Sequence, residues 1–171
     1  VHLRQAWRGH VPAKFFLFFQ AQGLLVVILS PPFLLAAFDP APAPSAIDLA
    51  AATLWLVAVT GEAVADRQLA RFRAHPSTRG QVCRQGLWRY SRHPNYFFEW
   101  LVWVAYALLA TRAPWGWTAW LSPALILYFL FRVTGIPATE AQARRSKGEA
   151  YREYQRTTSA FVPWFPRNVR P

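Results

Sequence analysis

Four long apolar segments, separated by polar connections, dominate the pattern of hydrophobic and polar positions along the chain. They cover about residues 15–38, 47–65, 95–110 and 117–134. Crossing the hydrocarbon core of a bilayer takes about 20 helical residues, with roughly 17 as the lower end. No strand-like alternation of any length is present in the sequence. The pattern predicts an all-α fold, a polytopic transmembrane helical bundle with about four spans in one membrane domain, residues 1–171.

Prolines inside two of these segments predict departures from straight helices. Proline has no amide N–H, and its ring clashes with the preceding helical turn. Pro31 and Pro32 therefore predict a kink near the end of the first segment, and Pro123 predicts a bend in the fourth.

The composition supports a membrane protein that is also strongly basic. Of the 171 residues, 54% are hydrophobic, and 19 Lys and Arg outnumber 8 Asp and Glu for a net charge of +11. A soluble domain of this size is rarely so apolar and so basic together. The absence of Met predicts a fragment without its own N-terminus. The single Cys83 excludes an internal disulfide and a cysteine-based zinc cluster, and we expect no metal.

Positive charge alternates across the connections between the segments. The connection at 39–46 has none, the loop at 66–94 holds seven arginines, and the tail at 135–171 is again basic. By the positive-inside rule, the arginine loop and the tail face the cytoplasm. Because the basic residues lie between membrane spans, we expect a lipid bilayer as the partner and no nucleic acid. The arginines of the loop are Arg67, Arg71, Arg73, Arg79, Arg84, Arg89 and Arg92.

Two pairs of polar residues lie where apolar segments meet the arginine loop. Glu62 and Asp66 are four residues apart, as are Asn95 and Glu99, so each pair shares a helix face. Pro94 fits the first turn of a helix that would present the second pair. Ionisable groups inside a span are costly, about 2.5–3.5 kcal/mol each, and need a compensating role. Either they line one cavity beneath the arginines, or they pair with nearby arginines and hold the loop down.

A cavity with arginines above and carboxylate and amide groups below suits a large anionic cofactor. Guanidinium groups bind phosphates in a bidentate manner, and carboxylates and amides can bind ribose hydroxyls or a carboxamide. The sequence contains neither a strand-associated GxGxxG nor a GxxxxGK[ST] motif. Helices and loops would therefore have to hold any nucleotide.

The tail predicts an amphipathic helix from Glu140 to Arg156, followed by the apolar sequence AFVPWFP. This apolar stretch can return to the membrane surface. The helix either lies at the interface and contacts only headgroups, or it closes over the cofactor with Glu140, Arg144 and Tyr154 facing it.

Three sequence elements carry a resemblance to a known family. YSRHPNYFFEW (90–100), GIPATE (135–140) and YREYQRTTSAFVPWFP (151–166) resemble bacterial membrane proteins of the steroid 5-alpha-reductase-like family, in its C-terminal part. The resemblance runs from about residue 15 to 166. The Arg-His-Pro-x-Tyr element also occurs in isoprenylcysteine and phospholipid methyltransferases, which are distantly related.

The resemblance implies an enzyme of the bacterial inner membrane that binds NADPH on the cytoplasmic side. It implies reduction of a carbon–carbon double bond conjugated to a carbonyl in a hydrophobic, lipid-like substrate. The family's Asn-x-x-Gly-Glu element has Phe98 in place of the glycine. The substrate-orienting glutamate and tyrosine of the family would lie upstream, so no catalytic residue is assigned. The candidate cofactor-binding residues are Asp66, Arg73, Arg84, Asn95, Glu99, Glu140 and Tyr154.

Two other functions remain open. An S-adenosylmethionine-dependent membrane methyltransferase would have a similar arrangement of Glu140, Tyr151 and Tyr154. A non-catalytic membrane scaffold would bind neither cofactor.

Overall fold

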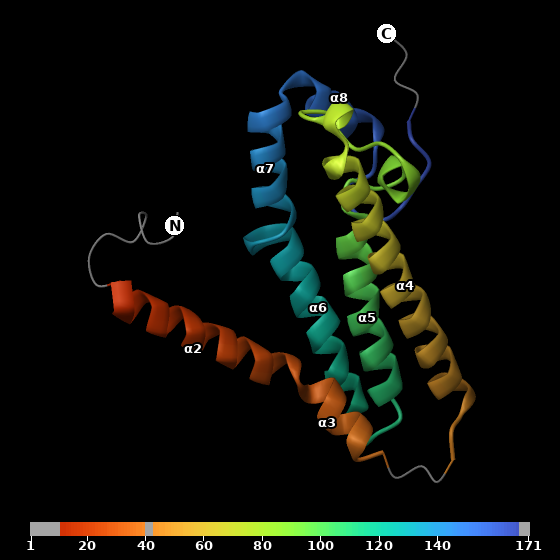
Figure 1. The fold of residues 1–171 in the computed structure, drawn as a ribbon. Coiled ribbons are helices and arrows are strands. Elements are labelled where there is room, and N and C mark those ends of the chain that lie inside the picture. The colour runs from red at the N-terminus through yellow and green to blue at the C-terminus, as the bar shows by residue number, and fades with distance from the viewer. Residues whose placement is uncertain (1–10, 40–42, 168–171) are drawn as a thin grey trace.

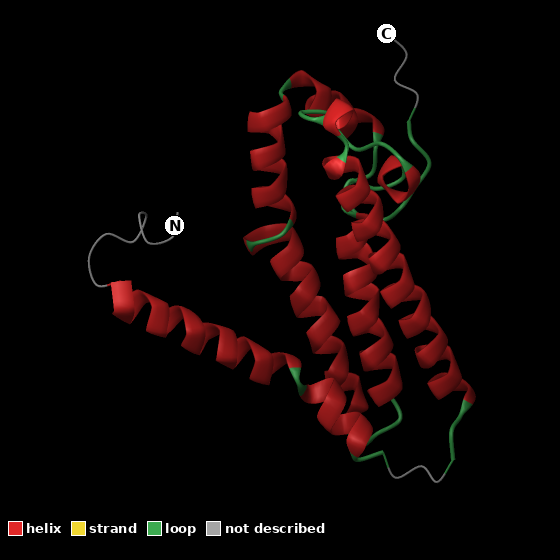
Figure 2. Cartoon of the chain, viewed as in Figure 1, coloured by secondary structure: helices red, strands yellow, loops and turns green. Residues whose placement is uncertain are grey.

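Helices make up nearly all of the regular structure in the computed structural model, which describes residues 11–39 and 43–167. The structure is 77% helical, and its described residues contain no strand (Figure 2). The predicted all-α membrane bundle is confirmed. Residues 1–10, 40–42 and 168–171, which include parts of the predicted first connection and tail, lie outside the described residues.

The first apolar segment forms two helices instead of one. α2 (Val11–Leu29) ends just before Ser30, and α3 (Pro31–Ala37) starts with the two prolines that predicted the kink. α3 packs on the bundle, whereas α2 leans away from it (Figure 1). Most apolar side chains of α2 are exposed, as expected of a helix surrounded by lipid.

α4 (Ala46–Ala74) and α5 (Pro94–Ala110) lie side by side, and α5 occupies the centre of the bundle between α4 and α6 (Leu121–Tyr128) (Figure 1). Ser45 and Asp48 form a reciprocal capping box at the start of α4. α4 buries three alanines spaced seven residues apart, Ala51, Ala58 and Ala65. Small side chains at this spacing allow close approach of the two helices.

The last apolar segment forms η3 (Gly116–Trp120), α6 and the π-helical η4 (Phe129–Val133). A bend at Thr134 and Gly135 joins it to α7 (Ile136–Lys147), the first helix of the basic tail. Trp100 of α5 donates a hydrogen bond from Nε1 to the carbonyl of Pro123 at 3.1 Å. The prediction of a single helix from Glu140 to Arg156 is wrong. Gly148 adopts φ +56°, which ends α7 and lets α8 (Glu149–Thr157) start in a new direction.

Three helical stretches are long and apolar enough to cross a membrane: Val11–Ala37, Ala46–Ala74 and Gly116–Lys147. α5 has 17 residues, the lower end of the length for a span, and packs along α4. The chain is therefore an integral membrane protein.

The arginine loop and the basic tail gather at one end of the bundle, which we call the polar end (Figure 1). It comprises the loop 75–93 with η1 (Pro76–Thr78) and η2 (Gly86–Arg89), the end of α7, α8 and residues 158–167. Backbone hydrogen bonds tie the tail to the loop, from Arg92 N to Ser159 O and from Trp164 N to Tyr90 O, both at 2.9 Å.

Candidate functional site

A pocket of about 300 Å³ lies at the polar end between α4, α5, α7 and α8. Four of the seven candidate cofactor-binding residues line it. Asp66 and Arg73 come from α4, Asn95 from the first turn of α5, and Tyr154 from α8. The fold thus brings together polar groups from three helices that are far apart in the sequence.

A second hollow of about 330 Å³ adjoins this pocket along α4 and α7. The two share Leu69, Arg73, Thr139, Ala143 and Lys147, so they are neighbours, and we call the two hollows together the groove. Each part lies near the lower end of the size range of ligand pockets, about 300–1,000 Å³. The groove can therefore accommodate an extended ligand better than either hollow alone.

Two cations, Arg73 and Lys147, lie at the junction of these hollows. They are close enough to repel each other electrostatically. Within the part of the chain that the structure describes, neither forms an ion pair with a carboxylate. Two neighbouring cations without an acidic partner favour binding of an anion such as a phosphate.

Tyr154 contributes its ring to the pocket, while its hydroxyl group is engaged with the backbone. The hydroxyl can donate to the carbonyl oxygen of Trp88 or to that of Ser91, which is 3.1 Å away. Burial raises the pKa of Tyr154 above its ordinary value, so the group stays neutral. Tyr154 therefore joins α8 to the turn 86–91 that closes the pocket.

Arg84 does not line the pocket. Its Nη2 donates to Glu153 at 3.1 Å and to the carbonyl of Ala150 at 2.9 Å, and the guanidinium lies 5.6 Å from the centre of the Tyr154 ring. These contacts hold the arginine loop on α8. The sequence left a pairing role open for Glu62, Asp66, Asn95 and Glu99, so the Arg84–Glu153 pair is a contact that it did not predict.

Glu140 forms hydrogen bonds with side chains outside α7 and does not face the pocket. Its carboxylate accepts hydrogen bonds from Arg92 Nε and Gln155 Nε2, each at 2.7 Å, and lies 3.4 Å from His93 Nε2. Neither Glu140 nor Arg144 lines the pocket, although Thr139 does. Glu140 thus fixes one wall of the pocket, because Arg92 and His93 belong to that wall.

Glu99 lies one helical turn further along α5 than Asn95, near Glu62 and Asp66 of α4. It is not among the residues that line the pocket. The adjacent Phe98, which stands where the family has glycine, packs on Gly61 of α4. A Cβ atom at Gly61 would lie 2.4 Å from the Phe98 ring. Phe98 therefore fills space between α4 and α5 and leaves the pocket open.

Several residues of the pocket wall were not among the candidate cofactor-binding residues, in particular Cys83, Arg92, His93 and Lys147. Arg92 and His93 belong to the Arg-His-Pro-Asn-Tyr element, which was a usable signal. Cys83 and Lys147 had no motif to mark them, and only the tertiary structure shows that Lys147, at the end of α7, lines the groove with residues of α4.

The fold and this pocket together define a helical integral membrane protein with a polar, cation-bearing cavity at one end of its bundle. The family model described as "Protein of unknown function (DUF1295)" matches residues 1–158, and the chain belongs to this family. DUF1295 is associated with steroid 5-alpha-reductase-like proteins. No curated protein and no solved structure matches the chain significantly.

Proposed function

We propose that the chain forms the NADPH-binding part of a membrane reductase for a carbon–carbon double bond conjugated to a carbonyl. The convergence of Asp66, Arg73, Asn95 and Tyr154 on one pocket carries the proposal. The membership of DUF1295 and the sequence elements of the steroid 5-alpha-reductase-like family support the same reaction class.

The residues of the groove fit the polar groups of a dinucleotide. Arg73 and Lys147 would hold phosphate groups, since they have no carboxylate partner among the described residues. Asp66 can accept hydrogen bonds from ribose hydroxyls, and the Asn95 side chain can both donate to and accept from a carboxamide. NADPH, when bound, supplies the hydride.

We place the polar end on the cytoplasmic side of a bacterial inner membrane, because NADPH is present in the cytoplasm. The seven arginines between residues 66 and 94 support this orientation through the positive-inside rule. A hydrophobic, lipid-like substrate would enter from the bilayer. The residues that orient its carbonyl are not assigned within this chain.

A methyltransferase that uses S-adenosylmethionine is the second candidate. The size of the pocket favours it, because about 300 Å³ suits a smaller cofactor than a dinucleotide. Tyr151, Tyr154 and Arg92 line the same pocket and would serve this cofactor equally.

Thermal unfolding of the purified chain in detergent tests both candidates against a non-catalytic scaffold. A ligand at 100 times its Kd stabilises the folded state by about 2.7 kcal/mol, which measurably raises Tm. We expect NADPH to raise Tm more than NADH or S-adenosylmethionine at equal concentration. A shift with S-adenosylmethionine alone would support the methyltransferase, and no shift with any of the three would support the scaffold.

A further inference from the structure

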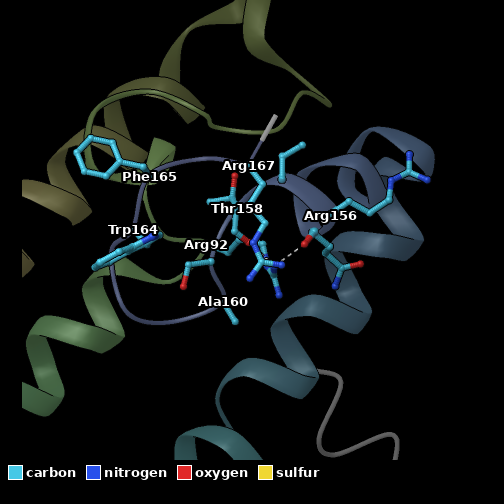
Figure 3. Close-up of a pocket in the computed structure, with 10 residues that line it drawn as sticks. Arg92, Arg156, Thr158, Ala160, Trp164, Phe165 and Arg167 are labelled. Carbon is cyan, nitrogen blue, oxygen red and sulfur yellow. Dashed lines mark hydrogen bonds between the residues drawn. The ribbon is translucent and has the colours of Figure 1, made fainter. Parts of the chain in front are cut away.

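A third pocket, of about 330 Å³, lies at the polar end and has Arg92 in common with the candidate cofactor site. Three arginines line it, Arg92, Arg156 and Arg167, together with the hydroxyl-bearing segment Thr157–Ser159. No carboxylate is among its lining residues. Trp164 and Phe165 lie on one side of it and Arg156 on the opposite side (Figure 3).

The backbone around this pocket is held firmly. Arg92 Nη1 donates to the carbonyls of Thr158 and Gln155, at 2.6 and 2.9 Å. The amide of Arg167 donates to Thr157 O at 2.8 Å, which folds the end of the tail back over α8. The backbone that carries Arg156 and Arg167 is therefore held in place by hydrogen bonds from Arg92 and within the tail.

The aromatic residues around the pocket fit a position at the boundary between the membrane and water. Phe161 precedes Trp164 and Phe165 in the chain and is buried against the first two turns of α5. Its ring centroid lies 5.5 Å from that of Phe97 and 5.9 Å from that of Trp100. A few residues later, Trp164 and Phe165 are 69% and 75% exposed. Large aromatic side chains at such a position are typical of the headgroup region of a bilayer.

We propose that this pocket binds the phosphate of an anionic phospholipid headgroup. The guanidinium groups of Arg156 and Arg167 supply donors for phosphate oxygens, as do the hydroxyls of Thr158 and Ser159. Arg156 also pairs with the exposed Glu149, with 3.3 Å between Nη2 and Oε1, and a phosphate would compete with this weak surface pair. A zwitterionic headgroup fits less well, because its ammonium group would meet arginines and no carboxylate. A soluble phosphate would leave Trp164 and Phe165 in water, whereas a lipid gives both rings an apolar neighbour.

The site is independent of the proposed reductase function, since it lies outside the candidate cofactor groove. The two sites share only Arg92, which lines both pockets. Arg92 remains paired with Glu140 and is not required as a phosphate ligand.

Native mass spectrometry of the purified full-length chain, with phosphatidylglycerol or phosphatidylcholine of equal chain length added, tests this proposal. A cation near a membrane surface contributes about 1 kcal/mol of attraction to anionic lipid, or about five-fold in affinity. We expect Arg156→Gln with Arg167→Gln to weaken phosphatidylglycerol binding by about thirty-fold and to leave phosphatidylcholine binding unchanged. The matched control, Arg145→Gln with Arg152→Gln, removes two exposed charges that do not line the pocket.

The outcomes separate lipid recognition from general attraction. Equal binding of the two lipids by the parent chain, or equal losses in both double variants, would overturn the proposal. Trp164→Ala provides a second variant that keeps every charge, and we expect it to weaken lipid binding. Inorganic phosphate that protects the chain against heat as well as the lipid does would refute a lipid as the occupant.

Discussion

Arg92 and Glu140 form a nearly buried ion pair, with 2.7 Å between Arg92 Nε and Glu140 Oε1 and side-chain exposures of 11% and 12%. The pair joins the residue two positions before α5 to the first half of α7. Because Gln155 of α8 donates to the same carboxylate, one acid connects three parts of the polar end. Arg92 lines both the candidate cofactor pocket and the proposed lipid pocket. Its position therefore depends on Glu140, which lines neither of them.

Replacing Glu140 by alanine tests this role. The change leaves Arg92 and His93 without their carboxylate, and breaking a buried pair costs about 3–5 kcal/mol. We expect a marked fall in Tm in detergent. Glu149→Ala is the matched control, since Glu149 pairs with two exposed arginines, and exposed pairs contribute about 0–1 kcal/mol. Equal losses in the two variants would contradict a structural role for Glu140.

Arg73→Gln tests the phosphate contact in the groove. A hydrogen bond to a charged group contributes about 1.5–3 kcal/mol, so NADPH affinity should fall by roughly ten- to a hundred-fold. Isothermal calorimetry or the ligand-induced shift in Tm measures the change. Arg71→Gln removes an equal charge two residues away on α4, outside both hollows of the groove, and should bind NADPH as the parent does.

Tyr154→Phe separates a structural tyrosine from a ligand-binding hydroxyl. The ring stays in the pocket, but a buried backbone carbonyl at Trp88 or Ser91 loses its donor. The unpaired group should lower the free energy of unfolding by about 1–3 kcal/mol and change NADPH affinity little. Tyr128→Phe, at an exposed position of α6, is the control for stability. Loss of NADPH binding with unchanged Tm would assign the hydroxyl to the ligand instead.

The reactivity of Cys83 can be used to measure access to the pocket, because Cys83 is the single cysteine of the chain and lines the cavity. Burial raises the pKa of its thiol above the ordinary value, so less reactive thiolate is present at pH 8. The proton is held more tightly in the folded state, and this contribution to stability is lost as the pH rises through the folded pKa.

We expect iodoacetamide to modify Cys83 more slowly in the folded chain than in the unfolded chain at pH 8, and the difference to narrow as the pH rises. NADPH should slow the reaction further, because a ligand in the pocket covers the thiol. Mass spectrometry of the alkylated chain measures both rates. Modification at the unfolded rate, with or without NADPH, would show that Cys83 does not report on a closed cavity.

Part of the site was predictable because its residues lie at helix ends that local sequence marks. Pro94 marks the start of α5, which puts Asn95 in the first turn, and the i, i+4 spacing puts Glu99 on the same side. Other residues required knowledge of their partners. Arg84 and Glu140 were candidate ligands from sequence, yet both form ion pairs within the polar end.

The sequence by itself determined that the chain is helical and lies in a membrane. The length and apolarity of a segment can be read from the sequence alone and compared with the thickness of a bilayer. The position of the break at Ser30 follows from adjacent prolines for the same local reason. Only the tertiary structure decided which charges meet. Arg92 and Glu140 are 48 residues apart, and their pairing depends on how α5 and α7 pack at the polar end. That packing leaves Asp66, Arg73, Asn95 and Lys147 on the groove.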